Sequence, residues 1–474
     1  MHFVFFINGL VLLFFASLMG LTALLFQDTA AEFLTSAVIS GLIGALLCLT
    51  TRSSFDRLQT VHTFLLTSSV WMTAAAVGAL PLFLWSLSPV DAFFEAMSGI
   101  TTTGSTVMTG LDGTARGIIF WRAVLQAVGG VGFIVTGIAL LPILNIGGMQ
   151  LFRTESSDKG EKELRNATLF ATATLKVYLG LMSLCAFIYF LGGMNGFDAI
   201  THAMTTLSTG GYSGYDASFG HFQSPFLEWT ATFFMFCGSL PFAWYIRVVT
   251  KRAFRSEQVS AMVMSLTVVI LSLSAWLVLF RSVAPLEALR MVAFNVVSVV
   301  STTGFATTDY TLWGPFAAFA FFALTSVGGC TGSTAGGAKA MRWLILKRSV
   351  GAQLQMIRSP HRMVVVRYEG QRINEDVWNG VITFFAFYFL TFAVLAVALD
   401  LLGLDFATAI SGALTALANV GPGVGPIIGP AGNFATLSDP VKMVLSLGMY
   451  LGRLEMVTVF VLLMPVFWRE VRSM

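Results

Sequence analysis

A nine-residue stretch without a charged residue occurs four times in this chain, and it constrains the fold more than any other feature. Each copy has Ser or Thr at its third position and Gly at its ninth. The copies span residues 96–104, 203–211, 296–304 and 413–421, so their last glycines lie 93 to 117 residues apart. An internal repeat of this kind indicates that one structural unit is built several times along the chain.

The composition is that of a membrane protein. Only 11% of the 474 residues are charged, whereas a soluble domain carries about 25%. Apolar segments of about 20 residues, enough for one bilayer crossing, recur throughout. We therefore expect an all-α integral membrane protein surrounded by a lipid bilayer. The net charge of +3 is small and dispersed, which gives no reason to expect nucleic-acid binding. The four cysteines lack metal-ligand spacing and are read as small buried residues.

Each copy of the repeat lies between two long apolar segments and overlaps the end of a short one. The short segments (89–100, 197–207, 285–300 and 405–418) cannot all span a bilayer, because 12 residues of helix reach only about 18 Å. They are expected to enter the membrane and return, with their backbone buried in protein or lining a watery cavity. The long segments are 58–85 and 118–144, 169–191 and 226–249, 259–280 and 313 onward, 377–402 and 441–467.

Two further apolar segments, 3–26 and 31–50, precede the repeats. The first lacks a basic leader and is read as a retained helix. We therefore predict ten transmembrane helices and four re-entrant pore hairpins in pseudo-fourfold helix–pore loop–helix repeats. The predicted divisions are 1–57 (two extra helices), 58–144 (repeat 1), 145–249 (repeat 2), 250–346 (repeat 3, with an intramembrane Gly-rich loop), 347–375 (a cytoplasmic loop) and 376–474 (repeat 4).

The distribution of Lys and Arg predicts the orientation. Basic residues gather after the even-numbered spans and at the C-terminus, whereas the opposite side has chiefly Arg116, Arg122, Arg281, Arg290 and Lys442. By the positive-inside rule, both termini are cytoplasmic and the four re-entrant loops enter from outside. The basic segment 347–375 is either a docking surface for a soluble partner or a plain consequence of this charge bias.

The four loops predict a site for a monovalent cation. A short helix that points into the bilayer places the negative end of its dipole near the midplane, and an acidic residue near its outer start suits the opposite end. Gly reaches backbone angles closed to other residues, so carbonyl groups can turn toward a central axis. Four such loops would form rings of carbonyl oxygens that replace the hydration shell of an ion. The alternative is close helix packing through small residues. The four acids are Asp91, Asp198, Glu287 and Asp405.

With these features the chain resembles the Trk/Ktr/HKT superfamily of potassium transporters, and within it the TrkH type. The resemblance rests on the two extra N-terminal helices and on STGGYS (208–213), STTGFA (301–306) and ANVGPGVG (418–425). It implies that potassium is the substrate and binds at a selectivity filter, with no cofactor in this chain. The implied filter residues are Thr102, Thr103, Gly104, Thr209, Gly210, Gly211, Thr302, Thr303, Gly304, Asn419, Val420 and Gly421.

The fourth loop departs from the other three. Asn419 and Val420 stand where hydroxyl residues are found elsewhere, so strict fourfold symmetry is not expected. The resemblance further implies a homodimer in the bacterial inner membrane. It also implies a cytosolic, nucleotide-binding regulatory subunit of the TrkA type.

A Gly-rich stretch, residues 328–342, interrupts the second span of repeat 3. Its five glycines each cost about 1 kcal/mol of helix stability relative to Ala, so the helix is expected to break there. The family has an intramembrane loop at this place, which is similar to a gate. The alternative is a close-packed helix crossing. The predicted gate residues are Gly328, Gly329, Gly332, Gly336, Gly337, Lys339 and Arg453.

Arg453 lies in an apolar span, where an ionisable group is a functional hypothesis by default. The resemblance to the family implies that this Arg acts as an electrostatic barrier to the ion beside the intramembrane loop. The alternative is a structural ion pair with an acid on another helix. We expect Glu455 not to be the partner, because residues two apart on a helix do not face each other.

Other functions are weighed against potassium uptake. A sodium-selective or sodium/proton-coupled potassium transporter of the same superfamily is the nearest alternative. An intramembrane enzyme would need clustered acids, His or Cys at depth, and the sequence shows no such cluster, so we do not expect an enzyme. An alternating-access carrier would show two inverted halves rather than four parallel repeats.

Overall fold

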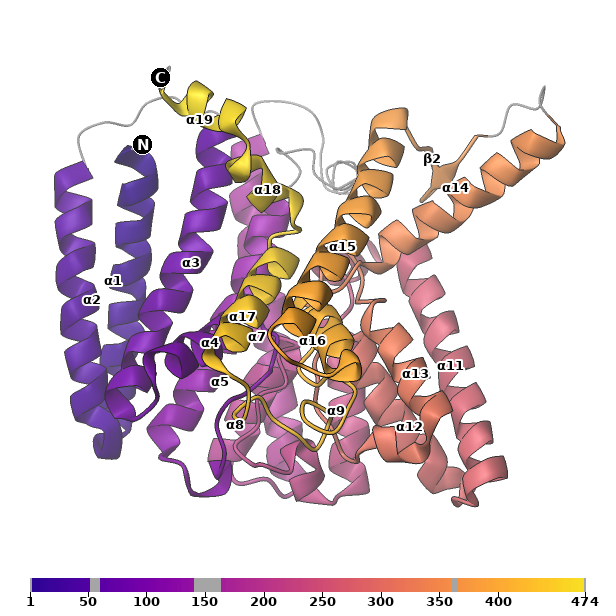
Figure 1. Cartoon of the computed structure of the whole chain (residues 1–474), viewed down its shortest axis with the longest axis horizontal. Coiled ribbons are helices and arrows are strands. Elements are labelled where there is room, and N and C mark those ends of the chain that lie inside the picture. Colours follow the sequence, from indigo (N-terminus) through magenta and orange to yellow (C-terminus); the bar gives the residue numbers. More distant parts are fainter. Residues whose placement is uncertain (1, 52–59, 140–162, 360–364, 473–474) are drawn as a thin grey trace.

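The computed structural model describes residues 2–51, 60–139, 163–359 and 365–472 (Figure 1). The predicted boundaries at 57/58 and 144/145 lie outside these residues. The chain begins with α1 (His2–Leu25), a single turn η1 (Gln27–Thr29) and α2 (Ala30–Thr51). Asn8 fixes α1 to α3 (Thr60–Trp85): its amide donates to the Ser69 hydroxyl and accepts from the Thr73 hydroxyl, both at 2.8 Å.

Four units follow, and each has a long helix, a short helix, a loop and a second helix. The long helices are α3 (Thr60–Trp85), α7 (Glu163–Leu191), α11 (Glu257–Arg281) and α15 (Glu375–Leu401). The short helices are α4 (Pro89–Ile100), α8 (Gly196–Leu207), α12 (Pro285–Val300) and α16 (Phe406–Ala418), within one residue of the predicted segments. The second helices begin with α5 (Arg116–Ala139), α9 (Pro225–Gly238), α13 (Pro315–Thr325) and α17 (Asp439–Arg453). Short turns η2 (Leu111–Gly113), η3 (Ser218–Phe222) and η4 (Tyr310–Trp313) lie in the connecting loops.

Local sequence explains where the short helices begin. Ser88, Asn195 and Asp405 each accept a hydrogen bond from the backbone N–H three residues further on, at 3.1, 2.9 and 3.1 Å. These are N-cap bonds, which satisfy donors that the first turn of a helix leaves unpaired. The remaining short helix, α12 of the third unit, has no side-chain cap and starts with Pro285, a residue suited to the first helical position.

The chain is mostly helical, with six helices long and apolar enough to cross a membrane among the described residues. The number rises to eight if each of two bent helix pairs counts as one span. The full set of ten spans and four re-entrant hairpins therefore stays a prediction.

Two spans that were predicted as continuous are bent, and in these places the prediction was wrong. In the segment 226–249, α9 and α10 (Phe242–Lys251) meet at 89°. Pro241 precedes α10 and has no N–H with which to continue α9. In the segment 441–467, α17 and α18 (Val457–Leu463) meet at 111°. Glu455 and Met456 both adopt positive φ there, which a continuous helix does not allow. A last helix, α19 (Pro465–Arg472), follows.

The segment 347–375 is also more ordered than a loop. Helix α14 (Ala340–Arg358) extends through its first twelve residues. A two-stranded hairpin follows, β1 (Arg367–Tyr368) and β2 (Gln371–Arg372), in which Arg367 pairs with Arg372. Its turn residues Glu369 and Gly370 both have positive φ, as a tight two-residue hairpin requires. The chain is thus not strictly all-α. Figure 1 shows α14 and the hairpin projecting from the bundle on the face where both termini lie.

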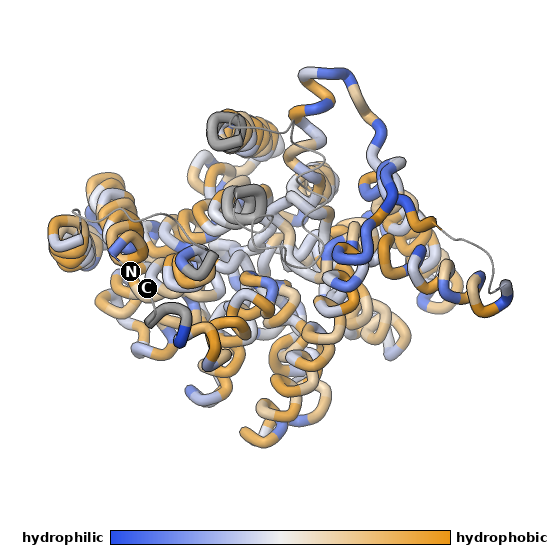
Figure 2. Tube along the Cα trace, turned by 90° about the horizontal axis from the view of Figure 1, so that it is seen from above, coloured by the Kyte–Doolittle hydropathy of each residue, from blue (hydrophilic) through white to orange (hydrophobic). Residues whose placement is uncertain are grey.

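The four units close into a ring. The second helix of each unit packs against the short helix of the next, in the pairs α5–α8, α9–α12, α13–α16 and α17–α4. The last pair returns from the fourth unit to the first. Viewed from above, the strongly hydrophobic residues lie mainly on the outer helices, and paler segments occupy the middle (Figure 2).

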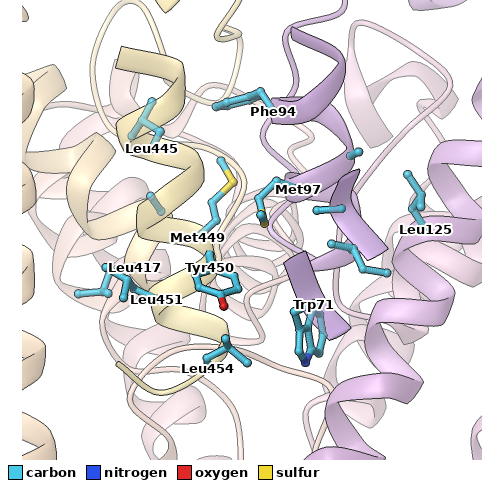
Figure 3. Close-up of a cluster of buried hydrophobic side chains, with 14 of the residues drawn as sticks. Trp71, Phe94, Met97, Leu125, Leu417, Leu445, Met449, Tyr450, Leu451 and Leu454 are labelled. Carbon is cyan, nitrogen blue, oxygen red and sulfur yellow. The ribbon is translucent and has the colours of Figure 1, made fainter. Parts of the chain in front are cut away.

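The buried apolar side chains form two cores rather than one. One core joins units 4 and 1 with part of α14, and includes Met449 of α17, Met97 of α4 and Leu125 of α5. Figure 3 shows Met449 and Met97 pointing toward each other, with Leu125 apart from them. The other core joins units 2 and 3 and includes Phe234 of α9 and Phe294 of α12. The ring is therefore two packed halves around a shared centre.

Candidate functional site

The four short helices end in the same backbone motif. The seventh residue of each repeat, which lies one or two positions after the helix, has a left-handed φ: 53° at Thr102, 53° at Thr209, 60° at Thr302 and 55° at Asn419. The N–H of the next residue then bonds the carbonyl of the hydroxyl residue five positions earlier. These bonds run from Thr103 to Ser98, Gly210 to Thr205, Thr303 to Ser298 and Val420 to Thr415, at 2.8 to 3.0 Å. This is the Schellman arrangement, which ends a helix and satisfies its last carbonyls.

Three of these left-handed positions hold a β-branched residue. Gly is usual at such a position, and a left-handed φ costs another residue about 1–2 kcal/mol. Asn tolerates the conformation better than Thr does. Asn419 therefore departs from the other loops in its side chain, while the backbone there follows the same path.

The ninth-position glycines lie against one another in a closed circle, which we call the glycine ring. A methyl group added to Gly104 would overlap the carbonyl oxygen of Gly210, and one added to Gly211 would overlap that of Thr303. A methyl on Gly304 would meet the backbone nitrogen of Gly421 at 2.9 Å. A methyl on Gly421 would meet the carbonyl oxygens of Thr103 and Gly104 at 3.2 Å, which closes the circle.

The circle is regular for three loops and altered at the fourth. Gly104, Gly211 and Gly304 have φ of 88°, 75° and 83°, and Gly421 does not share this positive φ. Gly304 accordingly faces the nitrogen of Gly421, not the oxygen of Val420. The departure predicted for the fourth loop is thus located at its glycine.

Hydroxyl side chains hold the loops after the glycines. Ser298 donates to the Phe305 carbonyl at 2.6 Å, and Thr415 donates to the Pro422 carbonyl at 2.8 Å. Between loops, the Ser105 hydroxyl donates to the Gly421 carbonyl at 2.9 Å, and the Asn419 amide donates to the Thr103 hydroxyl at 3.1 Å. The repeated Ser or Thr at the third position therefore has a structural role in at least two of the four loops.

Space is distributed very unequally on the two sides of the glycine ring. On one side all four ring glycines line a cavity of about 310 Å³, together with the loops that follow them. At its edge, partial burial and a 2.6 Å hydrogen bond to Asp198 raise the pKa of the Tyr215 hydroxyl to about 12. On the other side a pocket lined by Gly336, Asn419 and Arg453 has only about 10 Å³, room for about one water molecule.

The Gly-rich stretch lies on the narrow side. The chain is non-helical from the end of α13 at Thr325 to the start of α14 at Ala340. The Gly336 N–H donates to the Thr302 hydroxyl at 2.7 Å, and the Thr334 hydroxyl donates to the Leu207 carbonyl at 3.0 Å. The stretch is thus tied to the ends of two short helices, α12 and α8, directly below the glycine ring.

Arg453 is buried and contacts the Gly-rich stretch. Its guanidinium donates to the Thr334 carbonyl at 3.1 Å and to the Gly129 carbonyl of α5 at 3.2 Å. It also lies over the ring of Trp71, with its central carbon 5.5 Å from the ring centroid. A cation over a tryptophan face is favourable, and more so when desolvated.

An ion pair does occupy this region, but it joins two other residues. Arg342 of α14 and Glu455 approach to 2.5 Å, and both are buried. Lys339 is buried as well and donates to the Ala335 carbonyl. Three basic side chains, Lys339, Arg342 and Arg453, thus gather around one acidic side chain, Glu455. Like charges at this depth are costly, and they oppose the passage of a cation.

A buried polar network on the side of the 310 Å³ cavity, which we call the wide side, was not predicted from the sequence. Glu95 of α4 and Arg122 of α5 form a buried ion pair at 2.8 Å. Glu95 also accepts from the Val107 N–H at 2.9 Å, and Arg122 donates to the Ser213 carbonyl at 2.8 Å. The pair thus connects the first two loops. The signal was present, because Glu95 is an ionisable residue inside an apolar short segment.

The basic residues that the sequence analysis placed on the outer side include some with partners. Arg122 is a buried residue of α5. Lys442 of α17 pairs with Asp91 of α4 at 2.6 Å, and Arg290 of α12 pairs with Glu228 of α9 at 3.1 Å. These two pairs join unit 4 to unit 1 and unit 2 to unit 3, the same units that share a core.

Four uncharged loops that meet inside a bundle of apolar helices are typical of a cation transport protein. The family model of the TrkH cation transport proteins matches residues 30–269 and 259–469. This chain belongs to that family. The membership confirms the resemblance and the expectation of a transport protein rather than an enzyme.

Several characterised proteins and one solved structure are similar over most of the chain. The Trk system potassium uptake protein TrkI of Halomonas elongata is 48% identical over 413 residues, 86% of this chain and 84% of that protein. TrkH of Escherichia coli strain K12 is 34% identical, with 98% of both chains covered. The crystal structure of the potassium transporter TrkH from Vibrio parahaemolyticus superposes with a TM-score of 0.90 at 31% identity, covering 98% of this chain and 99% of that one.

Proposed function

We propose that this chain takes up potassium across the bacterial inner membrane through a filter built from its four loops. The observation that carries the proposal is the closed glycine ring, in which backbone atoms of each loop lie against the glycine of its neighbour. The names of the similar proteins, which are potassium uptake proteins, support potassium as the cation.

The proposed filter uses main-chain oxygens. Carbonyls of Thr103, Gly210 and Thr303 lie at the glycine ring, each against the glycine of the preceding loop. Oxygens arranged around an axis can replace the water around a monovalent cation without any side-chain charge. The negative ends of four short helix dipoles add to the attraction. The twelve residues of the predicted filter carry no ionisable side chain.

The proposed gate is the Gly-rich stretch together with Arg453. In this conformation the cavity beneath the glycine ring is nearly filled, and three buried basic residues lie beside it. Opening then requires the stretch to leave the ends of α8 and α12. A cytosolic TrkA-type subunit is the proposed source of that force, and a homodimer is the proposed assembly.

The proposed orientation places both termini in the cytoplasm. Both termini, α14 and the hairpin lie on one face of the molecule (Figure 1). The hairpin carries Arg367 and Arg372, and α14 ends at Arg358. This basic face suits the cytoplasmic side by the positive-inside rule. The 310 Å³ cavity would then open outward, toward the potassium that is taken up.

Ion flux into vesicles tests the proposal. The purified chain is reconstituted and uptake of radioactive rubidium, a potassium substitute, is compared with uptake of sodium-22 at matched gradients. We expect rubidium to enter faster than sodium, and unlabelled potassium to compete. Protein-free vesicles are the control. Faster sodium entry would favour the sodium-selective alternative. Loss of rubidium uptake on collapse of a sodium or proton gradient, at fixed membrane potential, would favour the coupled one.

A further inference from the structure

Gln126 of α5 is buried, and both ends of its amide are bound to the second loop. Its Nε2 donates to the Gly210 carbonyl at 2.8 Å, and its Oε1 accepts from the Tyr212 N–H at 3.0 Å. The two partners fix which end of the amide is nitrogen, because a carbonyl only accepts and a backbone N–H only donates. One side chain thus holds the residues on both sides of Gly211.

The contact explains a peculiarity of the second loop. The position before the ring glycine is Thr103 in the first loop, Thr303 in the third and Val420 in the fourth, but Gly210 in the second. A methyl group on Gly210 would overlap the Gln126 amide, whose oxygen would lie 2.5 Å away. Gly210 and Gln126 therefore depend on each other, since no larger residue fits at 210 while the glutamine is in place.

Neighbouring residues keep Gln126 and the second loop in register. Arg122 lies four residues earlier, on the same face of α5. It donates to the Ser213 carbonyl and lies over the Tyr212 ring, 4.1 Å from the centroid. The Tyr212 hydroxyl donates to the Glu95 carbonyl at 2.8 Å. The loop segment from Gly210 to Ser213 is therefore bonded to the first unit at several points.

The second loop is unlike the others in this respect. Within the described residues, no side-chain donor bonds the carbonyls of Thr103, Thr303 or Val420, whereas the Gly210 carbonyl accepts from Gln126. A carbonyl oxygen has two lone pairs. The bond to Gln126 uses one and thereby sets the direction of the other, while the oxygen itself lies against Gly104 in the ring.

We propose that Gln126 is a positioning residue for ion selectivity, which fixes the direction of the Gly210 carbonyl at the glycine ring. The inference rests on the proposed function, because it assigns this carbonyl to the cation site. Discrimination between cations of different size depends on how firmly the coordinating oxygens are held and on the number that reach the ion. Without the amide, the second loop loses its two side-chain bonds around Gly211, and the ring tolerates a smaller ion better.

Replacing the amide tests the inference. In Gln126→Leu vesicles we expect the ratio of rubidium to sodium uptake to fall about threefold to tenfold, the range that one or two lost hydrogen bonds allow. Gln126→Glu keeps the shape and the acceptor but loses the donor to Gly210, so its ratio should also fall. The matched control is Asn8→Leu, which removes a buried amide with similar bonds from α1. Its ratio should equal that of the wild type.

A double substitution separates positioning from packing. Gly210→Ala alone should nearly abolish rubidium uptake, because the new methyl overlaps the amide. Combined with Gln126→Ala it should regain uptake, because the space is free, but with the low selectivity of a loop without its amide. A double variant as inactive as Gly210→Ala would contradict the coupling of the two positions.

The failure of the inference differs from the failure of the proposed function. If the wild type prefers rubidium and both Gln126 variants keep its ratio, Gln126 has no part in selectivity. If the wild type itself does not prefer rubidium, the proposed function is wrong. Should Gln126→Leu not yield monodisperse protein, the ratio measured for Gln126→Glu decides, since that variant conserves the side-chain shape.

Discussion

The two sides of the glycine ring are built on opposite principles. On the wide side, four similar loops surround a cavity of about 310 Å³, and the residues at its floor are uncharged. On the narrow side, a segment of unit 3 and an arginine of unit 4 fill the space, and most of the buried ionisable residues there are basic. The wide side repeats one element four times, whereas the narrow side uses residues that occur once.

The difference fits the two proposed tasks of this region, which are binding the cation and closing its path. Holding a desolvated cation needs several equivalent oxygens, which repetition supplies. Opening and closing requires a segment that can move between two conformations. The glycine ring cannot supply such a segment, because the backbone of each loop is packed against the next. The third and fourth units therefore carry the singular features, and these can change without disturbing the ring above them.

The strongest test of this comparison is a substitution that places an extra methyl group in the glycine ring. Gly211→Ala places a methyl over the Thr303 carbonyl at a residue with φ of 75°. Strain and overlap together should exceed about 3 kcal/mol, so we expect rubidium uptake to fall at least about a hundredfold. Gly403→Ala is the matched control, because Gly403 has φ of 92° but open space around its Cα. Normal uptake by Gly211→Ala would show that the ring does not conduct.

On the narrow side, removal of a residue that occurs once should raise uptake rather than lower it. Arg453→Ala removes a positive charge and two bonds to main-chain carbonyls, so we expect uptake to rise about threefold to tenfold while the protein still elutes as the wild type does. Arg281→Ala is the control, since Arg281 also lies near a tryptophan ring, at 5.9 Å, but at the C-terminal end of α11, away from the Gly-rich stretch. Unchanged flux would remove Arg453 from the gate.

A smaller effect should come from the bond that connects the two sides. Thr302→Val keeps the β-branched shape but leaves the Gly336 N–H without its acceptor. Because the closed state loses about one hydrogen bond, uptake should rise about twofold to fivefold. Thr209→Val occupies the equivalent place in the second loop, where the hydroxyl donates to the Ser208 carbonyl instead. Equal effects of the two variants would show that the Gly336 contact is unimportant.

The smallest effect is expected where neither side of the ring is touched. Lys442→Met breaks the pair with Asp91 between units 4 and 1. We expect the midpoint of thermal denaturation to fall by about 1–3 °C, as for a partly exposed ion pair. The ratio of rubidium to sodium uptake should not change. Arg290→Met, in the corresponding pair between units 2 and 3, should behave alike, and an altered ratio in either variant would tie these outer pairs to selectivity.

Much of the ring could be predicted from sequence because its determinants are local. The left-handed φ at Thr102, Thr209, Thr302 and Asn419 follows from the end of a short helix, and the glycines that come two residues later stand out in the repeat. Local capping residues likewise set the starts of the short helices. The bounds of the four short helices could therefore be predicted without knowing which helices pack against them.

The remainder depends on which helices become neighbours. Nothing near Glu95 in the sequence names Arg122 as its partner, and Gln126 looks like any polar residue on a helix until the second loop is placed beside it. The bend before α10 could have been predicted from Pro241, but the length of the apolar segment favoured a continuous helix. The bend at Glu455 and Met456 had no such signal, because neither residue favours positive φ.

The division of the apolar interior into two blocks has a mechanical consequence. Units 4 and 1 share one block and units 2 and 3 share the other, and each block is also joined by its own ion pair. Helix α14 contributes Met341 and Ile345 to the first block, whereas Cys330 of the Gly-rich stretch belongs to the second. The Gly-rich stretch therefore crosses from one half to the other, and a pull on α14 would strain this crossing before it deformed either half.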